Sequence, residues 1–491
     1  MEGRVFGIET EFGCLVHDPE AGTPEEVVER IKDHAFLQKK LGVIDLHARN
    51  YAFEPARSGG FLTNGARLYV DAVGSHEEYA TPECSGIFDV VTWDKAGHRL
   101  LQEVINDLEL QGAVSLHNNS VDHFGGHTFG CHENYLVRAE DLYFSDALLS
   151  LLPFLVTRQI YAGAGRVGGH RLNYTDLRRN VMTLGEHEVD YMWIRDFYGV
   201  EIDRGVDYQL SQRADHIVNL VSSRVRFNRA LINPRRDSYY DFSGMQRLHL
   251  LFGEANMSEY AMALKVGATC LALRLMEMRA LPRSVRLADP LEALRSVSRD
   301  PSWKWLVDRQ DGTPIPAIEV QRSYLDAARA CLAGQDEETD WVLREWEDVL
   351  DLLEKDPMSL SDRLDWVAKR KLMETFIAEE GARWGDDVLH SLDLEYHNIN
   401  RESGLYYALE EQGGVRRVTT DAAIERATRA APRNTRAWGR SHVIRELIQR
   451  RVRRYAVDWD SVYVDQSRRL ELRDPFRPYK QEAARFVRRM L

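Results

Sequence analysis

The chain is poor in cysteine and has no long uninterrupted apolar segment. Its 491 residues include five cysteines, which are scattered over positions 14, 84, 131, 270 and 331. An odd, dispersed set argues against a disulfide framework, so we expect small core residues. No run of about 18 apolar residues occurs, and the first residues lack the apolar region of a signal peptide. We therefore expect a cytoplasmic protein without a membrane partner.

Basic residues are too few to offset the acidic ones. The chain has 64 lysines and arginines against 77 aspartates and glutamates, a formal net charge of −13. This balance disfavours general affinity for nucleic acid, and we expect no nucleic-acid partner. Hydrophobic residues make up 44% of the chain and charged residues 29%, as in a globular protein. The length suffices for a large core and a second, small domain.

Two short segments alternate apolar residues with functional ones, which predicts strands with one polar face each. In residues 7–12 (GIETEF), Glu9 and Glu11 would share a face because successive side chains of a strand point to opposite sides. In residues 66–71 (ARLYVD), the polar face would carry Arg67, Tyr69 and Asp71. Such a floor suits Mg²⁺ and a triphosphate that the metal bridges. An ordinary antiparallel sheet with one wet face is the alternative interpretation.

Turn and helix signals organise the rest of the chain. Residues 23–26 (TPEE) are typical of a capping box with proline at the first helical position, and we expect this helix to end at Gly42. Residues 64–65 (Asn-Gly) predict a tight turn into the second strand. Apolar spacing predicts further helices over residues 86–111, 140–162, 317–333, 338–355 and 361–380, the last ending at Gly381. Segregated strands and helices favour an α+β fold over a doubly wound sheet.

A change of composition predicts a domain boundary near residue 413. After the glycine pair at 413–414, arginines occur at positions 416, 417, 426, 429, 433, 436 and 440. We therefore expect an ATP- and Mg²⁺-binding catalytic domain over residues 1–413. A small C-terminal domain is expected over residues 414–491.

Longer segments follow one another along the chain. They are GIETEFG (7–13), NGARLYVD (64–71), GSHEEYATPEC (74–84), FGCHENYL (129–136), LSQRADHI (210–217), GEANMSE (253–259), DWVAKRKLME (365–374), LDLEYHNINR (392–401), VDW (457–459) and RDPFR (473–477). Together they resemble the family formed by the Pup ligases (PafA) and the related depupylases and deamidases (Dop). Motifs of this length, in one order over most of the chain, are far more specific than a single short pattern.

The resemblance implies a fold, an activity and partners. The fold would be a glutamine-synthetase-like catalytic domain, a curved antiparallel sheet backed by helices, with a C-terminal domain that contributes to the nucleotide site. The activity would be ATP-dependent ligation of the side-chain carboxylate of the C-terminal glutamate of Pup, or a Pup-like modifier, to a lysine of target proteins through an acyl phosphate. Ligation would mark these targets for the proteasome pathway. ATP and Mg²⁺ are the implied cofactors.

The matching motifs also carry the family's site residues onto this chain. The implied metal ligands are Glu9, Tyr69 and Glu78. The implied ATP contacts are Arg67, Thr81 and Trp459, and the implied catalytic residue is Asp71. An arginine can fork onto phosphate oxygens and an indole can cover an adenine face, so these residue types suit their roles. Glu11 is a further candidate metal ligand because it shares the predicted face of Glu9, although a solvated or salt-bridged strand residue is the alternative.

Hydrolysis is the alternative activity within the same family. LTNGARLYVD and TPEC lean toward the depupylase, whereas GIETEFG, GSHEEYAT, NMSE, VDW and RDPFR look more like the ligase. The segment between the first two motifs also looks too short for the long loop typical of the depupylase. We therefore favour the ligase over cleavage of the Pup isopeptide or of a C-terminal glutamine amide.

The chain departs from the family pattern at three places. One additional residue lies between Asp71 and Glu78, and Glu77 stands where proline is typical, so either glutamate could be the metal ligand. Residues 169–207 form an insertion that predicts a lid, a partner surface or a decorated loop. Residues 232–237 (INPRRD) differ from the usual family stretch, although Arg235 survives as a candidate phosphate ligand.

Other patterns permit different functions. Residues 163–168 match GxGxxG but follow an apolar stretch that looks helical and lie in no βαβ unit, which argues against a dinucleotide site. A zinc metallohydrolase could use His117, His123, His127, Cys131 and His132, yet their spacing matches no compact zinc motif. The basic segment 445–454 is first a solvated helix face, second a docking surface for the modifier or target, and last a nucleic-acid patch.

Overall fold

A long strand, β1 (Phe6–Val16), lies at the centre of the main sheet in the computed structural model. The structure describes residues 1, 3–44, 59–71, 76–122, 128–138, 146–172, 200–222, 229–234, 244–465 and 467–490. Within these residues, ten strands form the sheet in the order β10-β11-β12-β7-β1-β5-β4-β3-β2, and β6 also pairs with β1. The other strands are β2 (Gly42–Ile44), β3 (Gly59–Leu62), β4 (Arg67–Val70), β5 (Glu77–Ala80), β6 (Val114–His117), β7 (Cys131–Arg138), β10 (Asn219–Val221), β11 (Ala230–Asn233) and β12 (Met245–Leu250).

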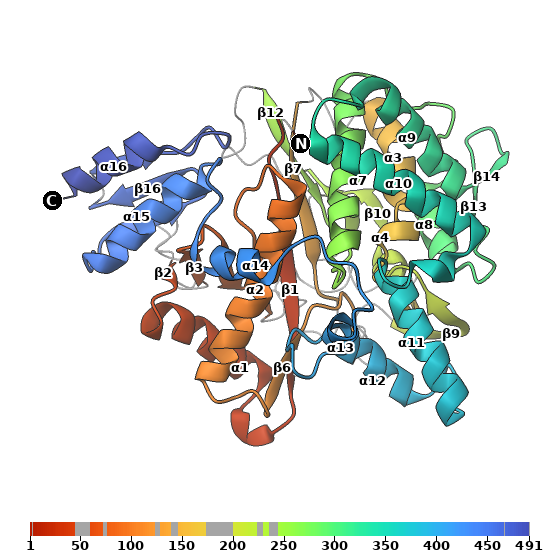
Figure 1. Cartoon of the computed structure of the whole chain (residues 1–491), viewed down its shortest axis with the longest axis horizontal. Helices are drawn as coiled ribbons and strands as arrows, with labels where there is room; N and C mark the ends of the chain where they lie inside the picture. The colour runs from red at the N-terminus through yellow and green to blue at the C-terminus, as the bar shows by residue number, and fades with distance from the viewer. Residues whose placement is uncertain are drawn as a thin grey trace, which may run out of the picture.

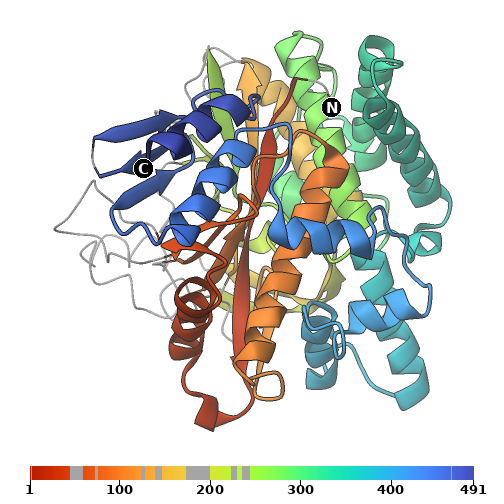
Figure 2. The same ribbon diagram turned by 60° about the vertical axis from the view of Figure 1, so that its left-hand side comes forward.

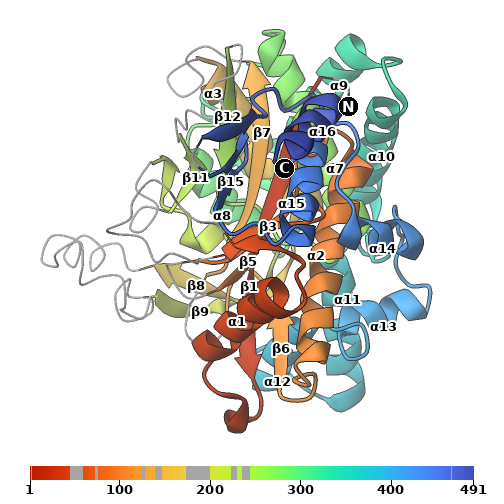
Figure 3. The same cartoon turned by 90° about the vertical axis from the view of Figure 1, so that its left-hand side faces the viewer.

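Helices back one face of this sheet (Figures 1 and 3). Helix α2 contacts β1, α7 contacts β7, and α9 and α10 pack outside α7. The helices of this part are α1 (Pro24–Asp33), α2 (Ile87–Asp107), α3 (Asp146–Thr157), α4 (Gln159–Ala162), α7 (Glu259–Glu277), α8 (Pro290–Arg299), α9 (Ala317–Leu332), α10 (Glu337–Lys355), α11 (Asp365–Glu380), α12 (Asp387–Tyr396), α13 (Leu405–Glu411) and α14 (Asp421–Arg429). Among the helices so described, none is both long and apolar enough to cross a membrane.

Alternation along β1 separates the core from the site. Phe6 and Ile8 are buried in the large cluster that includes residues of α2, α3, α7, α9 and α10. Phe12 is buried in a second cluster with residues of α1, α2 and β4. Glu9 and Glu11, which alternate with these residues, are only partly buried. The predicted α+β class is therefore confirmed, with one parallel pair, β10 with β11, in an otherwise antiparallel sheet.

Local signals predict most helix ends correctly. The Thr23 hydroxyl and the Glu26 carboxylate form the expected capping box of α1, and Gly381 ends α11 with a φ of 70°. The predicted stop at Gly42 is wrong. The helix continues from α1 into a wider π-helical turn over His34–Gln38, whereas Gly42 begins β2. A Cβ on Gly42 would lie 2.2 Å from the carbonyl oxygen of Phe61, so close strand pairing explains this glycine.

A C-terminal unit lies against the β2–β3 edge of the sheet (Figures 1 and 2). It contains α15 (Ala437–Gln449), a sheet of β15 (Tyr455–Asp458), β16 (Ser461–Val464) and β17 (Arg468–Glu471), and α16 (Lys480–Arg489). Its apolar core includes Val43 of β2 and Phe61 of β3. By contrast, α14 packs on α2. The division at residues 413–414 stays a prediction.

A buried ion pair joins this unit to the main sheet. Glu83, which follows β5, accepts hydrogen bonds from Arg436 Nε at 2.6 Å and from Arg440 Nη2 at 2.5 Å. Arg440 also donates to the carbonyl oxygens of Gly65 and Trp459. Burial raises the pKa of Glu83, but Arg440 and Arg436 outweigh it and lower the pKa to about 2. Both guanidinium groups therefore depend on this carboxylate for charge compensation.

We expect Glu83→Gln to destabilise the protein by about 3–5 kcal/mol, because it leaves two buried guanidinium groups without a carboxylate. Urea unfolding at pH 7 measures the loss. The depressed pKa implies that the wild-type contribution is present above the unfolded value of about 4.3 and is lost as the pH falls toward the folded value. Glu379→Gln, at an exposed position, is the control and should change stability by less than about 0.5 kcal/mol. Equal stability of the two variants would contradict this role of Glu83.

Candidate active site

Strand register collects polar side chains on the face opposite the helices. Residue Glu78 of β5 pairs with Glu11 of β1 on one side and with Tyr69 of β4 on the other. Two residues before Glu11 in β1, Glu9 pairs with Ala80 of β5 and with His132 of β7. Directly opposed residues of antiparallel strands share a face. The sheet therefore brings Glu9, Glu11, Tyr69 and Glu78 together, as their alternation predicts, and Arg67 joins them opposite Ala80.

Register also distinguishes the two adjacent glutamates. Glu77 pairs with Phe12 and Val70, so its side chain points to the face opposite Glu78. Glu77 is fully buried there, and neither of its carboxylate oxygens has a hydrogen-bond partner. Glu78 lies on the polar face with Glu11. Of the two, only Glu78 is positioned to bind the same metal ion as the other carboxylates.

The charge on this face is partly compensated by histidines. Asn134 Nδ2 donates to Glu9 Oε1 at 3.0 Å, and His132 Nδ1 lies 3.3 Å from Glu9 Oε2. Burial raises the pKa of Glu9, but the neighbouring His132 and His249 outweigh it and hold the pKa well below its usual range. His76 lies 3.2 Å from Glu11 Oε2. Against the effect of burial, this contact lowers the pKa of Glu11 to about 2.

The pKa values of Glu78 and Tyr69 shift in the opposite direction. Burial, reinforced by the charges of Glu9 and Glu11, raises the pKa of Glu78 well above its usual range. Burial and the Glu78 charge likewise raise the pKa of Tyr69. A bound cation would relieve the repulsion among these carboxylates, because each would gain an opposite charge. The oxygen-rich donor set fits a divalent cation of the Mg²⁺ type.

Two histidines extend this donor set. Ligand atoms of Glu9, His132 and His249 all lie within 4.8 Å of one another. His249 Nε2 is buried 3.7 Å from Glu9 Oε2 and has no closer hydrogen-bond partner. Burial lowers the pKa of His249 to about 4, so the ring is neutral at pH 7 and its nitrogen can bind a metal. Sequence reasoning missed His249, although the alternation of Arg247 and His249 in residues 245–250 (MQRLHL) carried the signal.

The described members of the zinc set considered from sequence, His117, Cys131 and His132, do not come together. Cys131 and His132 are consecutive in β7 and point to opposite faces, and Cys131 is buried in the main core. His117 lies 3.5 Å from Glu395. His123 and His127 lie outside the described residues. Of the three described members of this set, only His132 contacts the polar face.

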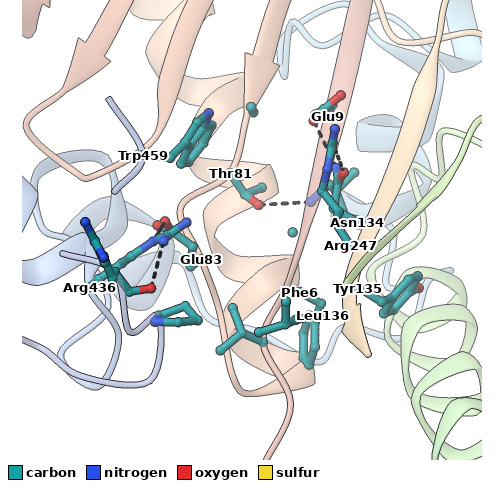
Figure 4. A pocket seen from close by; sticks show the side chains of 16 residues that line it. Phe6, Glu9, Thr81, Glu83, Asn134, Tyr135, Leu136, Arg247, Arg436 and Trp459 are labelled. Carbon is teal, nitrogen blue, oxygen red and sulfur yellow. Dashed lines mark hydrogen bonds and ion pairs between the residues drawn. The ribbon is translucent and has the colours of Figure 1, made fainter. Parts of the chain in front are cut away.

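A pocket adjoins the polar face and reaches the C-terminal unit (Figure 4). Its lining includes Glu9, Thr81, Arg247 and Trp459. The Thr81 hydroxyl is buried and accepts a hydrogen bond from the Ile8 amide at 3.0 Å. Two of the three residues expected to contact ATP, Thr81 and Trp459, therefore meet in one pocket with Glu9.

The third expected ATP contact and the expected base lie beside this pocket. The Arg67 guanidinium is 4.5 Å from the Tyr69 ring centre, and Arg67 is not among the lining residues. Asp71 directly follows β4, and its amide donates to the His76 carbonyl at 2.9 Å. Its charge contributes to the raised pKa of Glu78, so Asp71 belongs to the same electrostatic neighbourhood. Residues 72–75, which hold the additional loop residue, lie outside the described part of the chain.

The glycine-rich segment has a packing role. Residues 163–168 connect α4 to β8 (Arg166–Leu172), the first strand of a hairpin with β9 (Val200–Gln209). Gly165 has a φ of 69°, and a Cβ there would lie 2.2 Å from the Tyr208 hydroxyl. The Gly165 carbonyl accepts hydrogen bonds from Lys369 and Gln212. Such close packing supports the expectation that this segment binds no dinucleotide.

The remaining departures are only partly described. The 169–207 insertion begins and ends in the β8–β9 hairpin, whereas residues 173–199 lie outside the described part. Arg235 also lies outside it. In the basic segment, Arg445 donates to the carbonyl oxygens of Thr63 and Arg429, and Arg450 pairs with Glu446. Arg451, Arg453 and Arg454 are exposed.

Comparison with known proteins identifies the family. The family model described as Pup-ligase protein matches residues 4–463. The chain belongs to the Pup-ligase family. It is 36% identical to the Pup–protein ligase of Nocardioides sp. over 99% of both chains. It is 37% identical to the Pup–protein ligase of Xylanimonas cellulosilytica over the whole of both chains.

Solved structures of Pup ligases share the fold. The ligase PafA in complex with Pup has a TM-score of 0.81 and 31% identity, covering 99% of this chain and 91% of that chain. PafA in complex with ADP has a TM-score of 0.75 and 31% identity, covering 95% of this chain and 94% of that chain. These matches confirm the predicted family and the glutamine-synthetase-like α+β fold that it implies.

The two faces of β5 lead to a test at Glu77. We expect Glu77→Gln to raise the free energy of unfolding at pH 7.5 by about 1–3 kcal/mol, because burial raises the pKa of the Glu77 carboxyl well above its usual range, which costs stability at this pH, whereas the amide is neutral in both states. Urea unfolding of the metal-free protein provides the measurement. Exposed Glu379→Gln again serves as the control. A loss of stability in Glu77→Gln would mean that this carboxylate has a stabilising partner and would contradict our description.

Proposed function

We propose that this chain is an ATP-dependent ligase that joins the side-chain carboxylate of the C-terminal glutamate of Pup, or of a Pup-like modifier, to a lysine of target proteins. The observation that carries the proposal is the carboxylate face of Glu9, Glu11 and Glu78 beside a pocket that also contains Thr81 and Trp459. Two relatives that match this chain over their full length are named Pup–protein ligases. Modified targets would enter proteasomal degradation.

The polar face is the proposed metal centre. Glu9, Glu11 and Glu78 supply carboxylates and Tyr69 a phenol, and His132 and His249 complete the donor set. Bound Mg²⁺ would neutralise charge on the phosphoryl group during its transfer. The converging carboxylates and the His249 ring nitrogens, which have no hydrogen-bond partner, support this assignment.

The nucleotide is proposed to occupy the adjoining pocket. Trp459 would cover the base, and the Thr81 hydroxyl would donate to the nucleotide. Arg67 would contact phosphate from the polar face, which adjoins the pocket. Trp459 is held by an edge-on contact with Phe61 at 5.0 Å and by the Arg440 guanidinium at 4.8 Å from its ring centre. Because the C-terminal unit carries one wall of the pocket, its rigid docking would hold that wall in place.

The proposed reaction has two steps. A carboxylate is a poor electrophile, so an oxygen of the modifier's glutamate first attacks the γ-phosphorus of ATP, and the bond to ADP breaks. The lysine nitrogen then attacks the acyl carbon and phosphate leaves. A free lysine has a pKa of about 10.4 and is mostly protonated at neutral pH, so a base must accept a proton. We assign that role to Asp71, which lies at the end of β4 next to the metal face.

The conjugation reaction tests the proposal. Wild-type protein incubated with ATP, Mg²⁺, a glutamate-ending Pup and a lysine-bearing target should form an isopeptide conjugate, seen as the sum of both masses less one water. Cleavage of preformed conjugates, or deamidation of a glutamine-ending Pup, without any ligation would contradict the proposal and favour the hydrolase.

Asp71→Asn should slow conjugation by about 10²–10⁴-fold, because the amide cannot accept the lysine proton. ADP release in the absence of a target lysine should fall less, since it needs no such base. Single-turnover measurement of both steps separates them. If both steps slow equally, Asp71 supports the whole site and is not the base for lysine.

Glu78→Gln should weaken Mn²⁺ binding, with Mn²⁺ as the probe for the metal centre, by at least about tenfold, because a charged ligand becomes neutral. Electron paramagnetic resonance titration measures the affinity. Glu77→Gln is the matched control one position away and should bind Mn²⁺ as the wild type does, since its side chain points to the opposite face. The reverse order of the two variants would exclude Glu78 as a ligand.

A further inference from the structure

Arg247 is a cationic side chain in the pocket that the motif comparison did not assign. It belongs to β12, pairs with Leu136 of β7, and lies in the pocket next to Asn134 (Figure 4). Its Nη1 donates to Asn134 Oδ1 at 2.7 Å. Asn134 Nδ2 in turn donates to Glu9 Oε1 at 3.0 Å. A continuous chain of hydrogen bonds thus joins the arginine to a carboxylate of the polar face.

The order of the groups in this series of hydrogen bonds determines the orientation of the Asn134 side-chain amide. Arg247 can only donate and an ionised Glu9 can only accept, so Asn134 must turn its oxygen to the arginine and its nitrogen to the glutamate. Neither leucine nor alanine at this position could connect the two. The relay consequently couples the position of the Arg247 guanidinium to that of the Glu9 carboxylate.

Charge distribution distinguishes Arg247 from the other arginines that line the pocket. Arg436 is committed to Glu83 at 2.6 Å. Arg473 lies on the C-terminal unit, contacts Glu471, and has a side chain that is 64% exposed. Arg247 stands on the sheet itself, beside Glu9 and His249. Its charge helps to lower the pKa of His249. It therefore places positive charge where the pocket meets the proposed metal centre.

The floor between Arg247 and Thr81 is open to a ligand. Gly7 pairs with Asn134 in register, and a Cβ at Gly7 would lie 3.1 Å from Thr81 Oγ1. The absent side chain lets a ligand approach the backbone at this point. Trp459 and Leu136 provide apolar lining for a base, whereas Glu9 and Arg247 provide polar lining. A polyphosphate that extends from base to metal would pass the guanidinium.

We propose that Arg247 binds the α- and β-phosphates of the nucleotide, and that Asn134 acts through it as a positioning residue that aligns Glu9 with the bound phosphates. The inference rests on the proposed function and adds a phosphate ligand to it. A guanidinium has five N–H donors in a planar fork, which suits Arg247 to bind phosphate oxygens from its place in the pocket. Nucleotide binding and the position of Glu9 are then linked through one amide.

Calorimetric binding of ADP and of adenosine tests the phosphate contact. Arg247→Met should weaken ADP binding by about 10–100-fold, the effect of losing one charged hydrogen-bonded partner, and change adenosine binding less than about twofold. Arg247→Lys should retain part of the ADP affinity because it keeps the charge but loses the fork. Arg453→Met, at an exposed position of the C-terminal unit, is the control and should bind as the wild type does.

A double-mutant cycle tests the role of Asn134. Asn134→Leu alone should weaken ADP binding, and Asn134→Leu combined with Arg247→Met should weaken it no further than Arg247→Met does. Fully additive losses would show that Asn134 acts independently and would overturn the relay. Equal losses of ADP and adenosine affinity in Arg247→Met would show a structural role and overturn the phosphate contact. Circular dichroism and thermal melting verify that each variant is folded.

The outcome separates this inference from the proposed function. A wild-type protein that binds no ADP and forms no conjugate contradicts the proposed ligase itself. A wild type that binds ADP and ligates, together with an Arg247→Met variant that binds ADP equally well, contradicts only the phosphate contact. Because Arg247→Lys preserves the charge and the aliphatic stem, it still provides a test if Arg247→Met does not fold.

Discussion

The pairing of β5 between β1 and β4 is the constraint on which the site depends. Its register sets Glu78 between Glu11 and Tyr69, and Glu9 lies two residues away along β1. Because opposed residues of antiparallel strands share a face, this one alignment concentrates three carboxylates. A shift of one residue would place Glu77 on the polar face and turn Glu78 into the core. Tyr79, which alternates with Glu78 and is buried in the cluster with residues of α1 and α2, opposes that shift.

Concentrating like charges on a sheet is unfavourable, and the surrounding residues show how the fold tolerates it. Glu9 and Glu11 receive hydrogen bonds from imidazole and amide groups, which hold their pKa values low. The Tyr69 hydroxyl donates to Glu78, but burial and the charges of Glu9 and Glu11 outweigh this bond and raise the pKa of Glu78. A site prepared in this way favours a divalent cation, because the cation supplies the compensation that the protein lacks. The same argument explains why His249 is buried in its neutral form next to Glu9.

The C-terminal unit contributes to the site by being fixed in place. Glu83 follows β5 and is bound by Arg436 and Arg440, while Arg440 also contacts the ring of Trp459. One buried carboxylate thus links the sheet to the residue that forms the opposite wall of the pocket. Arg247 and Asn134 connect the other end of the pocket to Glu9. Pocket and carboxylate face are therefore one structure, with hydrogen bonds at both ends.

Alternation, capping and turn signals are local, and the sequence by itself determined what depends on them. It predicted the shared face of Glu9 and Glu11, the turn before Arg67, the capping box of α1 and the helices α2, α9, α10 and α11, because each follows from neighbours along the chain. Long ordered motifs also identified the family. Tertiary structure alone showed that Glu78 rather than Glu77 faces the other carboxylates, that His249, Asn134 and Arg247 lie beside Glu9, and that Gly42 begins a strand. These results depend on the register between strands that are far apart in sequence, which spacing along one strand does not specify.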